Sequence, residues 1–138
     1  MTSTFDPNIS IYDQLGGRAP VERLAATFYD VMELEEPELT ALHAHDSHTR
    51  KVSPEVRERF ALFLVGWLGG PAEYMARHGH PRLRMRHAHV PVNIAMRDAW
   101  LRCMDEAMRQ CQVEESVYRY LMTRFTQVAD FMRNVPED

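Results

Sequence analysis

Long apolar segments are missing from this chain of 138 residues, and their absence excludes one class of protein. No apolar run approaches the ~20 residues that a membrane-spanning helix needs. The first ten residues, MTSTFDPNIS, hold neither the basic segment nor the apolar stretch of a secretory signal. We therefore expect a cytoplasmic protein without a membrane partner.

Cysteine and lysine are also scarce. The two cysteines, Cys103 and Cys111, stand eight positions apart in one predicted helix, which is about 12 Å along its axis and beyond the reach of a disulfide. We expect both to be reduced thiols. Lys51 is the one lysine among 16 basic residues, so nearly all positive charge is arginine, whose planar fork suits carboxylate pairing.

Strong positive charge is absent as well. The net charge of -4 argues against a nucleic-acid partner, because such proteins present a basic surface. Walker loops, G-x-S-x-G elbows and H-E-x-x-H pairs are not found, which removes the common nucleotide-binding, hydrolase and zinc-protease interpretations. Positive charge is local, since no Asp or Glu occurs between Glu73 and Asp98. That segment suits a small anion.

No segment alternates apolar and polar residues between hairpin turns, so the sequence predicts an all-α fold in one domain. Four long helices are expected from apolar residues at helical spacing, over 21–32, 54–68, 93–111 and 117–132. Ser53 before Pro54 and Asn93 mark two helix starts, and Gly69-Gly70-Pro71 marks a helix end.

Shorter or irregular segments are expected between and around these helices. We predict a short helix over 11–15 and an irregular connector over 35–53. Residues 1–8 are interpreted as an N-terminal extension and residues 134–138 as a C-terminal tail of the single domain.

The most informative segment begins at Gly79 and reads GHPRLRMRHAHVPVNIAMRDAWLRCM. It interleaves arginine and histidine and then opens an amphipathic helix. Such a segment offers an imidazole for iron, guanidinium groups for carboxylates and an apolar wall for a flat cofactor. Two further motifs precede it, IYDQLGG from Ile11 and FLVGWLGGP from Phe63.

Together, in this order and with this spacing, the three motifs resemble those of the group II truncated haemoglobins over roughly residues 9 to 133. The resemblance implies a two-over-two helical sandwich, in which two antiparallel helix pairs stack across one another around a haem. Because no C-x-x-C-H motif is present, the cofactor is expected to be a non-covalently bound haem b with its iron.

The resemblance assigns the proximal iron ligand to His87, the histidine of RLRMRH. The family usually continues with Pro-Phe, and this chain has His89-Val90 instead, which makes His89 a rival ligand. Candidates for the haem propionates are Arg84, Arg86, Tyr74 and His80, and candidates for the distal wall are Phe60 and Phe63. The alternative interpretations are a solvated basic loop and ordinary core packing.

Distal hydrogen-bond donors are implied at Trp100, in DAWLRCM, and at Tyr29. A bound dioxygen gains negative character, which N–H and O–H groups stabilise in a dry cavity. Ordinary burial of two amphipathic aromatics is the alternative. His43 is assigned as a third distal group.

The register around His43 stays open, because the segment before Pro54 carries extra residues compared with the family, and His45 and His48 are alternatives for the same role. A distal histidine that closes the sixth iron position without gas is a further interpretation. His43, His45, Asp46 and His48 also form a weak candidate for a divalent-metal site, against which solvated loop histidines are the simpler interpretation.

The leading functional hypothesis is a haem protein that binds dioxygen and other diatomic gases, as in oxygen transport. Strong distal donors also suit an enzyme that acts on nitric oxide or peroxide with a separate reductant. A haem-free helical adaptor that binds a partner protein is the alternative from another class. The physiological ligand, the reductant and the oligomeric state are left open by the sequence.

Overall fold

The computed structural model describes residues 6–43, 51–82 and 91–135, and these contain seven helices and no β-strand. The helices are α1 (Ile11–Leu15), α2 (Arg18–Glu35), α3 (Pro37–Ala41), α4 (Pro54–Trp67), α5 (Glu73–His78), α7 (Ile94–Gln110) and α8 (Glu115–Phe131). The all-α prediction is confirmed, as are the four long helices and the short helix at Ile11–Leu15. None of the helices in these ranges is long and apolar enough to cross a membrane.

Side-chain caps fix where two of the long helices begin. The Ser53 hydroxyl accepts the N–H of Val56 at 3.3 Å, and Pro54 occupies the first turn of α4, where its missing N–H costs nothing. Asn93 caps α7 in the same way, since its Oδ1 accepts the N–H of Met96 at 2.9 Å. Both predicted starts are confirmed.

The glycines after α4 allow α1 to pack closely against the end of that helix. The N–H of Tyr12 donates to the carbonyl of Leu68 at 2.9 Å. A Cβ at Gly70 would lie 2.6 Å from the Tyr12 ring and 2.8 Å from the carbonyl oxygen of Val65. Only glycine fits this position, and Gly69 before it has a φ of 103°, a left-handed conformation that favours glycine after the end of α4.

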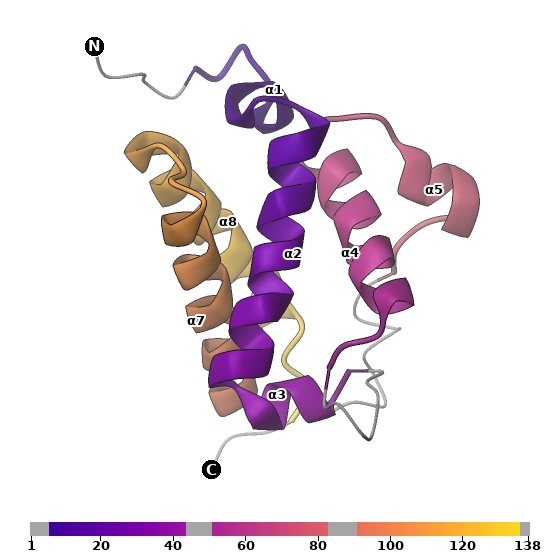
Figure 1. The fold of residues 1–138 in the computed structure, drawn as a ribbon, viewed down its shortest axis with the longest axis vertical. Helices are drawn as coiled ribbons and strands as arrows, with labels where there is room; N and C mark the ends of the chain where they lie inside the picture. Colours follow the sequence, from indigo (N-terminus) through magenta and orange to yellow (C-terminus); the bar gives the residue numbers. More distant parts are fainter. Residues whose placement is uncertain (1–5, 44–50, 83–90, 136–138) are drawn as a thin grey trace.

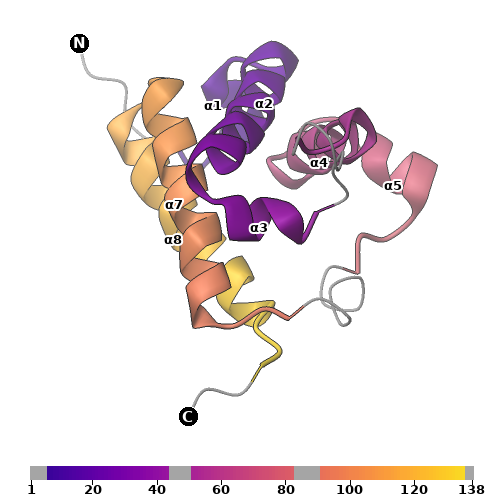
Figure 2. The same ribbon diagram turned by 60° about the horizontal axis from the view of Figure 1, so that its bottom comes forward.

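Helix α2 is central, with α4 and α5 on one side and α7 and α8 on the other (Figure 1). The chain runs in opposite directions along α2 and α4, and again along α7 and α8, so each pair is antiparallel. The most extensive contacts of α2 are with α7 and α4. Helix α3 lies at the end of this arrangement, between α2 and the connection to α4 (Figure 2).

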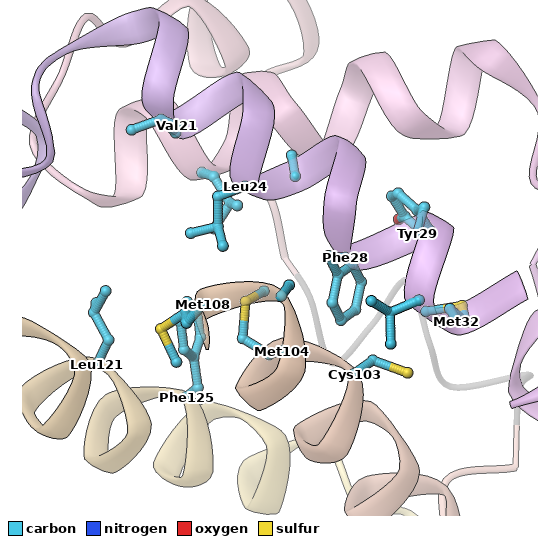
Figure 3. Packing of buried hydrophobic residues seen from close by; sticks show 14 of the residues in the cluster. Val21, Leu24, Phe28, Tyr29, Met32, Cys103, Met104, Met108, Leu121 and Phe125 are labelled. Carbon is cyan, nitrogen blue, oxygen red and sulfur yellow. The ribbon is translucent and has the colours of Figure 1, made fainter. Parts of the chain in front are cut away.

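The core joins the two helix pairs through large apolar side chains. Leu24, Phe28 and Met32 of α2 are at most 1% exposed, and Leu24 and Phe28 point toward α7, which carries Met104 and Met108 (Figure 3). Burial of these chains is the main source of stability for such a fold. Phe125 and Leu121 of α8 close the cluster from below.

Both cysteines are free thiols, as predicted. Cys103 is buried in the core, and burial raises its pKa to about 12, so the thiol stays neutral at physiological pH. Cys111 is half-buried and is the C-cap of α7, where its Sγ lies 3.5 Å from the Thr27 hydroxyl.

Two short helices, α3 and α5, were not predicted. Helix α3 falls within the connector expected to be irregular, and the Thr40 hydroxyl donates to the Met32 carbonyl at 3.0 Å, which ties α3 to the end of α2. Helix α5 follows the Gly-Gly-Pro stop and buries Tyr74. Neither α3 nor α5 is long enough to show a helical period in the sequence, and neither lies in one of the three motifs that support the family resemblance.

Candidate functional site

A cavity of about 540 Å³ lies between the helices, with α4, α7 and α8 supplying most of its wall. Residues of α2, α3, α4, α5, α7 and α8 line it, together with Val92 before α7. Most of the wall is aliphatic or aromatic. A volume in the range of roughly 300–1,000 Å³ and a mostly apolar wall with a few polar groups are typical of cofactor sites.

Tyr29 and Trp100 line this cavity from α2 and α7. The Phe28 ring lies between them, with centroid separations of 5.1 Å to each. Tyr29 is 3% exposed and Trp100 is half-buried. Neither the Tyr29 hydroxyl nor the Trp100 indole N–H has a hydrogen-bond partner in the described part of the chain. Two donors therefore stay available at the cavity.

The Tyr29 hydroxyl keeps its proton. Burial raises the pKa of Tyr29 above its usual range, and the charge of Arg57 opposes this shift only in part. The phenol is neutral at physiological pH and remains a hydrogen-bond donor.

His43 lines the same cavity beside Tyr29, with ring centroids 5.7 Å apart in an edge-to-face arrangement. Its Nδ1 lies 2.9 Å from the carbonyl oxygen of Leu39. A carbonyl only accepts, so Nδ1 carries the proton, and in the neutral ring Nε2 is the nitrogen with a lone pair. Of the three histidines weighed for the distal role, His45 and His48 lie outside the described residues.

Phe60 and Phe63 line the cavity from α4, stacked with centroids 6.4 Å apart. The Phe60 ring also contacts Tyr29 at 5.4 Å. Deeper in the wall, Trp67 and Trp100 each contact Phe125, at 5.1 and 5.6 Å.

The two described candidates for propionate contacts differ in position. Tyr74 is buried and lines the cavity, with its ring against Phe63 at 6.0 Å. His80 is exposed and is not among the described residues that line the cavity. Its Nδ1 accepts the N–H of Arg82 at 3.1 Å.

Four predicted residues, Arg84, Arg86, His87 and His89, lie outside the described residues. The described chain resumes at Pro91, and Val92 lines the cavity. The side-chain oxygen of Asn134 accepts the N–H of Val92 at 2.9 Å, and the N–H of Asn134 donates to the Val92 carbonyl at 3.0 Å. These two bonds fix the point at which the chain enters α7.

Arg59 and Arg97 are two arginines at the cavity that the sequence analysis did not single out. Arg97 is paired with Asp98 at 3.1 Å and with Asp130 at 2.8 Å. Arg59 is exposed and has no ion pair in the part of the chain that the structure describes. Its position was detectable, because Val56, Arg59, Phe60 and Phe63 follow the spacing of one helix face.

The residues present fit a flat apolar cofactor with an anionic edge. Aromatic and aliphatic side chains supply the apolar wall, and Arg59 supplies a cation that is exposed and has no ion pair among the described residues. Over residues 6–43, 51–82 and 91–135, no three His, Cys, Asp or Glu residues gather as a metal site. The candidate metal site around His45 lies outside these ranges.

Comparison with known proteins gives one family. The family model described as bacterial-like globin matches residues 10–134. A curated relative, group 2 truncated hemoglobin YjbI of Bacillus subtilis (strain 168), is 39% identical over 83 residues, which are 60% of this chain and 63% of that protein. The chain spans less than two thirds of the length of the curated relatives that it matches.

Solved structures match over nearly the whole chain. The cold-adapted truncated hemoglobin from the Antarctic marine bacterium Pseudoalteromonas haloplanktis TAC125 has a TM-score of 0.84 and 33% identity, covering 93% of this chain and 100% of that one. The group II 2-on-2 hemoglobin from Agrobacterium tumefaciens has a TM-score of 0.82 and 30% identity, covering 94% of this chain and 97% of that one. The predicted two-over-two architecture is thereby confirmed.

Proposed function

This chain belongs to the bacterial-like globin family, as a group II truncated haemoglobin, and from that premise we propose that it binds dioxygen and other diatomic gases at a haem held in the cavity. The main observation behind the proposal is that two donors, Tyr29 and Trp100, line a mostly apolar cavity of about 540 Å³ and have no hydrogen-bond partner among the described residues. When bound, the haem supplies an iron at which a diatomic gas binds.

The cavity wall holds the cofactor in this proposal. Phe60, Phe63 and Trp67 of α4 and Met96 of α7 offer apolar surface to the porphyrin plane. Arg59 pairs with a propionate, because it is a cation without an ion pair among the described residues. Arg84 and Arg86 are proposed as further propionate partners from their place in the motif. The cofactor is haem b, since the chain has no C-x-x-C-H attachment motif.

His87 is proposed as the proximal ligand, on the strength of its position in RLRMRH. His89 is the rival, two residues further on. Replacing His87 with Gly should abolish the spectrum of five-coordinate ferrous haem, and added imidazole should restore it in part. His89→Gly is the matched control and should keep the parental spectrum. The reverse result would move the ligand to His89.

Tyr29 and Trp100 act in the proposal as donors to the bound gas. Both side chains line the cavity, and neither donates to a protein acceptor among the described residues, so no existing hydrogen bond has to break. A donor inside a dry cavity favours a ligand with negative charge, because the low local dielectric strengthens the interaction. His43 lies beside Tyr29 in the same wall, and its Nδ1 donates to the carbonyl of Leu39.

Beyond gas binding, we propose that the protein converts nitric oxide or peroxide in a redox reaction. The reaction requires an external reductant, and the same distal donors would stabilise negative charge as an O–O bond is polarised. Steady consumption of peroxide or nitric oxide by the haem-loaded protein would establish an enzyme, whereas reversible gas binding alone would establish a carrier.

The haem-free adaptor is the weaker candidate. An adaptor needs an exposed apolar face, whereas the large aromatic side chains of α4 and α7 line a concave cavity between the helices here. An absorption spectrum after incubation with haem separates the two functions. A Soret band supports the haem protein, and its absence would favour the adaptor.

A further inference from the structure

Arg57 of α4 lies next to Tyr29 but outside the cavity. Its guanidinium carbon is 5.6 Å from the centroid of the Tyr29 ring, over the ring face. Arg57 is not among the described residues that line the cavity, whereas Tyr29 is. The cation therefore contacts the tyrosine ring from outside the cavity, at a distance typical of a cation–π interaction.

Three acceptors on α2 hold the guanidinium in place. Arg57 pairs with Asp30 at 3.1 Å and with Glu33 at 2.9 Å, and it donates to the carbonyl of Ala26 at 3.3 Å. Residues 26, 30 and 33 follow one face of α2, so the fork of Arg57 joins α4 to the turns of α2 on either side of Tyr29. A planar guanidinium can meet several acceptors at once, which an ammonium group does less well.

Glu33 extends the same network to the start of α4. Its Oε2 also accepts the N–H of Val52 at 2.6 Å, and the Glu33 side chain is only 14% exposed. Val52 is buried and directly precedes the Ser53 cap. The pair of Arg57 and Glu33 thus fixes α4 and its first residues relative to the helix that carries Tyr29.

We propose that Arg57 is a positioning residue for the Tyr29 hydroxyl, holding the tyrosine ring through its face while Glu33 and Asp30 hold the guanidinium. The inference rests on the proposed function, because it needs Tyr29 to donate to the bound gas. The cavity side of the ring is bounded by His43 and Phe60, at 5.7 and 5.4 Å, so the ring has contacts on several sides and its hydroxyl has a defined direction.

The test is a double-mutant cycle between Arg57→Gln and Tyr29→Phe in the haem-loaded protein. Arg57→Gln should speed dioxygen release by about two- to fivefold, the size expected for a lost cation–π contact. In the Tyr29→Phe background the same change should have no further effect on release. Arg57→Lys keeps the charge but not the planar guanidinium, so its rate of dioxygen release should lie between those of the parent protein and Arg57→Gln.

A spectroscopic readout separates positioning from general destabilisation. The stretching frequency of bound carbon monoxide reports the donor field at the ligand, and Arg57→Gln should move it toward the value of Tyr29→Phe. Thermal stability should fall by similar amounts in both backgrounds. Arg119→Gln breaks a surface pair with Glu115 at 3.0 Å on α8 and is the matched control, expected to change neither frequency nor release.

Each outcome decides the inference. Equal effects of Arg57→Gln with and without the Tyr29 hydroxyl would overturn it, since Arg57 would then be purely structural. If Tyr29→Phe itself leaves dioxygen release unchanged, the donor role in the proposed function fails and the inference fails with it. Should Arg57→Gln not fold, Arg57→Lys and Glu33→Gln provide the same comparison.

Discussion

Trp100→Phe is the substitution that tests the distal donors most sharply. Phenylalanine keeps an aromatic ring against Phe28 and Phe125, which contact the Trp100 ring at 5.1 and 5.6 Å, but it removes the indole N–H. Since that N–H has no partner among the described residues, its loss leaves no protein acceptor unsatisfied there. The change therefore isolates the hydrogen bond to the gas.

The expected size follows from the value of a buried hydrogen bond. A loss of roughly 1 to 3 kcal/mol corresponds to about a 5- to 150-fold faster release of dioxygen. Carbon monoxide is a poorer acceptor, so its release should change much less. Stopped-flow release of both gases from the ferrous protein measures the two effects, and Tyr29→Phe should act in the same direction and non-additively with Trp100→Phe.

Trp67→Phe is the matched control, because Trp67 lines the same cavity and contacts the same Phe125 ring, at 5.1 Å. Trp67 has no ring contact with Phe28 or Tyr29 in the described structure, so the control should leave the ratio of the two release rates unchanged. Equal changes for both gases in Trp100→Phe would indicate a steric gate. No change for either gas would refute the donor role of Trp100.

Arg59→Gln should speed transfer of haem to a scavenger protein, with a smaller effect at high salt because an exposed ion pair is screened, and an unchanged transfer rate would remove Arg59 from the cofactor site. Gly70→Ala should destabilise the fold by roughly 1–3 kcal/mol in thermal unfolding, because its Cβ would meet Tyr12 at 2.6 Å, whereas Gly66→Ala, with 3.6 Å to the nearest atom, should be tolerated. Hydrogen bonds from Arg97 and Arg133 lower the pKa of Asp130, so its carboxylate stabilises the fold above the unfolded-state pKa, and this contribution is lost as the pH falls through the lowered value. Asp130→Asn should therefore reduce the free energy of unfolding at neutral pH and make it depend less on pH in the acid range. An unchanged pH profile of stability would contradict the pairing.

The long helices were predictable because each carries its own local signals. Ser53 and Asn93 have the side chains that cap a helix, and apolar residues recur with the helical period behind them. Helix α3 has no comparable signal, because the Thr40 hydroxyl that ties it to Met32 is a contact between elements. That hydrogen bond depends on how α2 and α3 are placed relative to one another, which the local sequence does not predict.

The candidate site was predictable in part. Tyr29, His43 and Trp100 were assigned to one pocket by resemblance, and the structure brings them to one cavity. Arg59 was not singled out, although its spacing from Val56, Phe60 and Phe63 places it on the cavity face of α4. The position of Arg57 over the Tyr29 ring was not predictable from the sequence, because this contact depends on how α2 and α4 pack.

Haem titration of the purified chain tests directly whether the cavity holds haem. A Soret band should grow linearly with added haem and saturate at one haem per chain. Ala129→Trp, which places a large side chain at a position lining the cavity, should lower this binding, whereas Ala26→Trp on the exposed face of α2 should not. A chain that shows no saturable Soret band, or one whose band is indifferent to filling the cavity, would contradict the account.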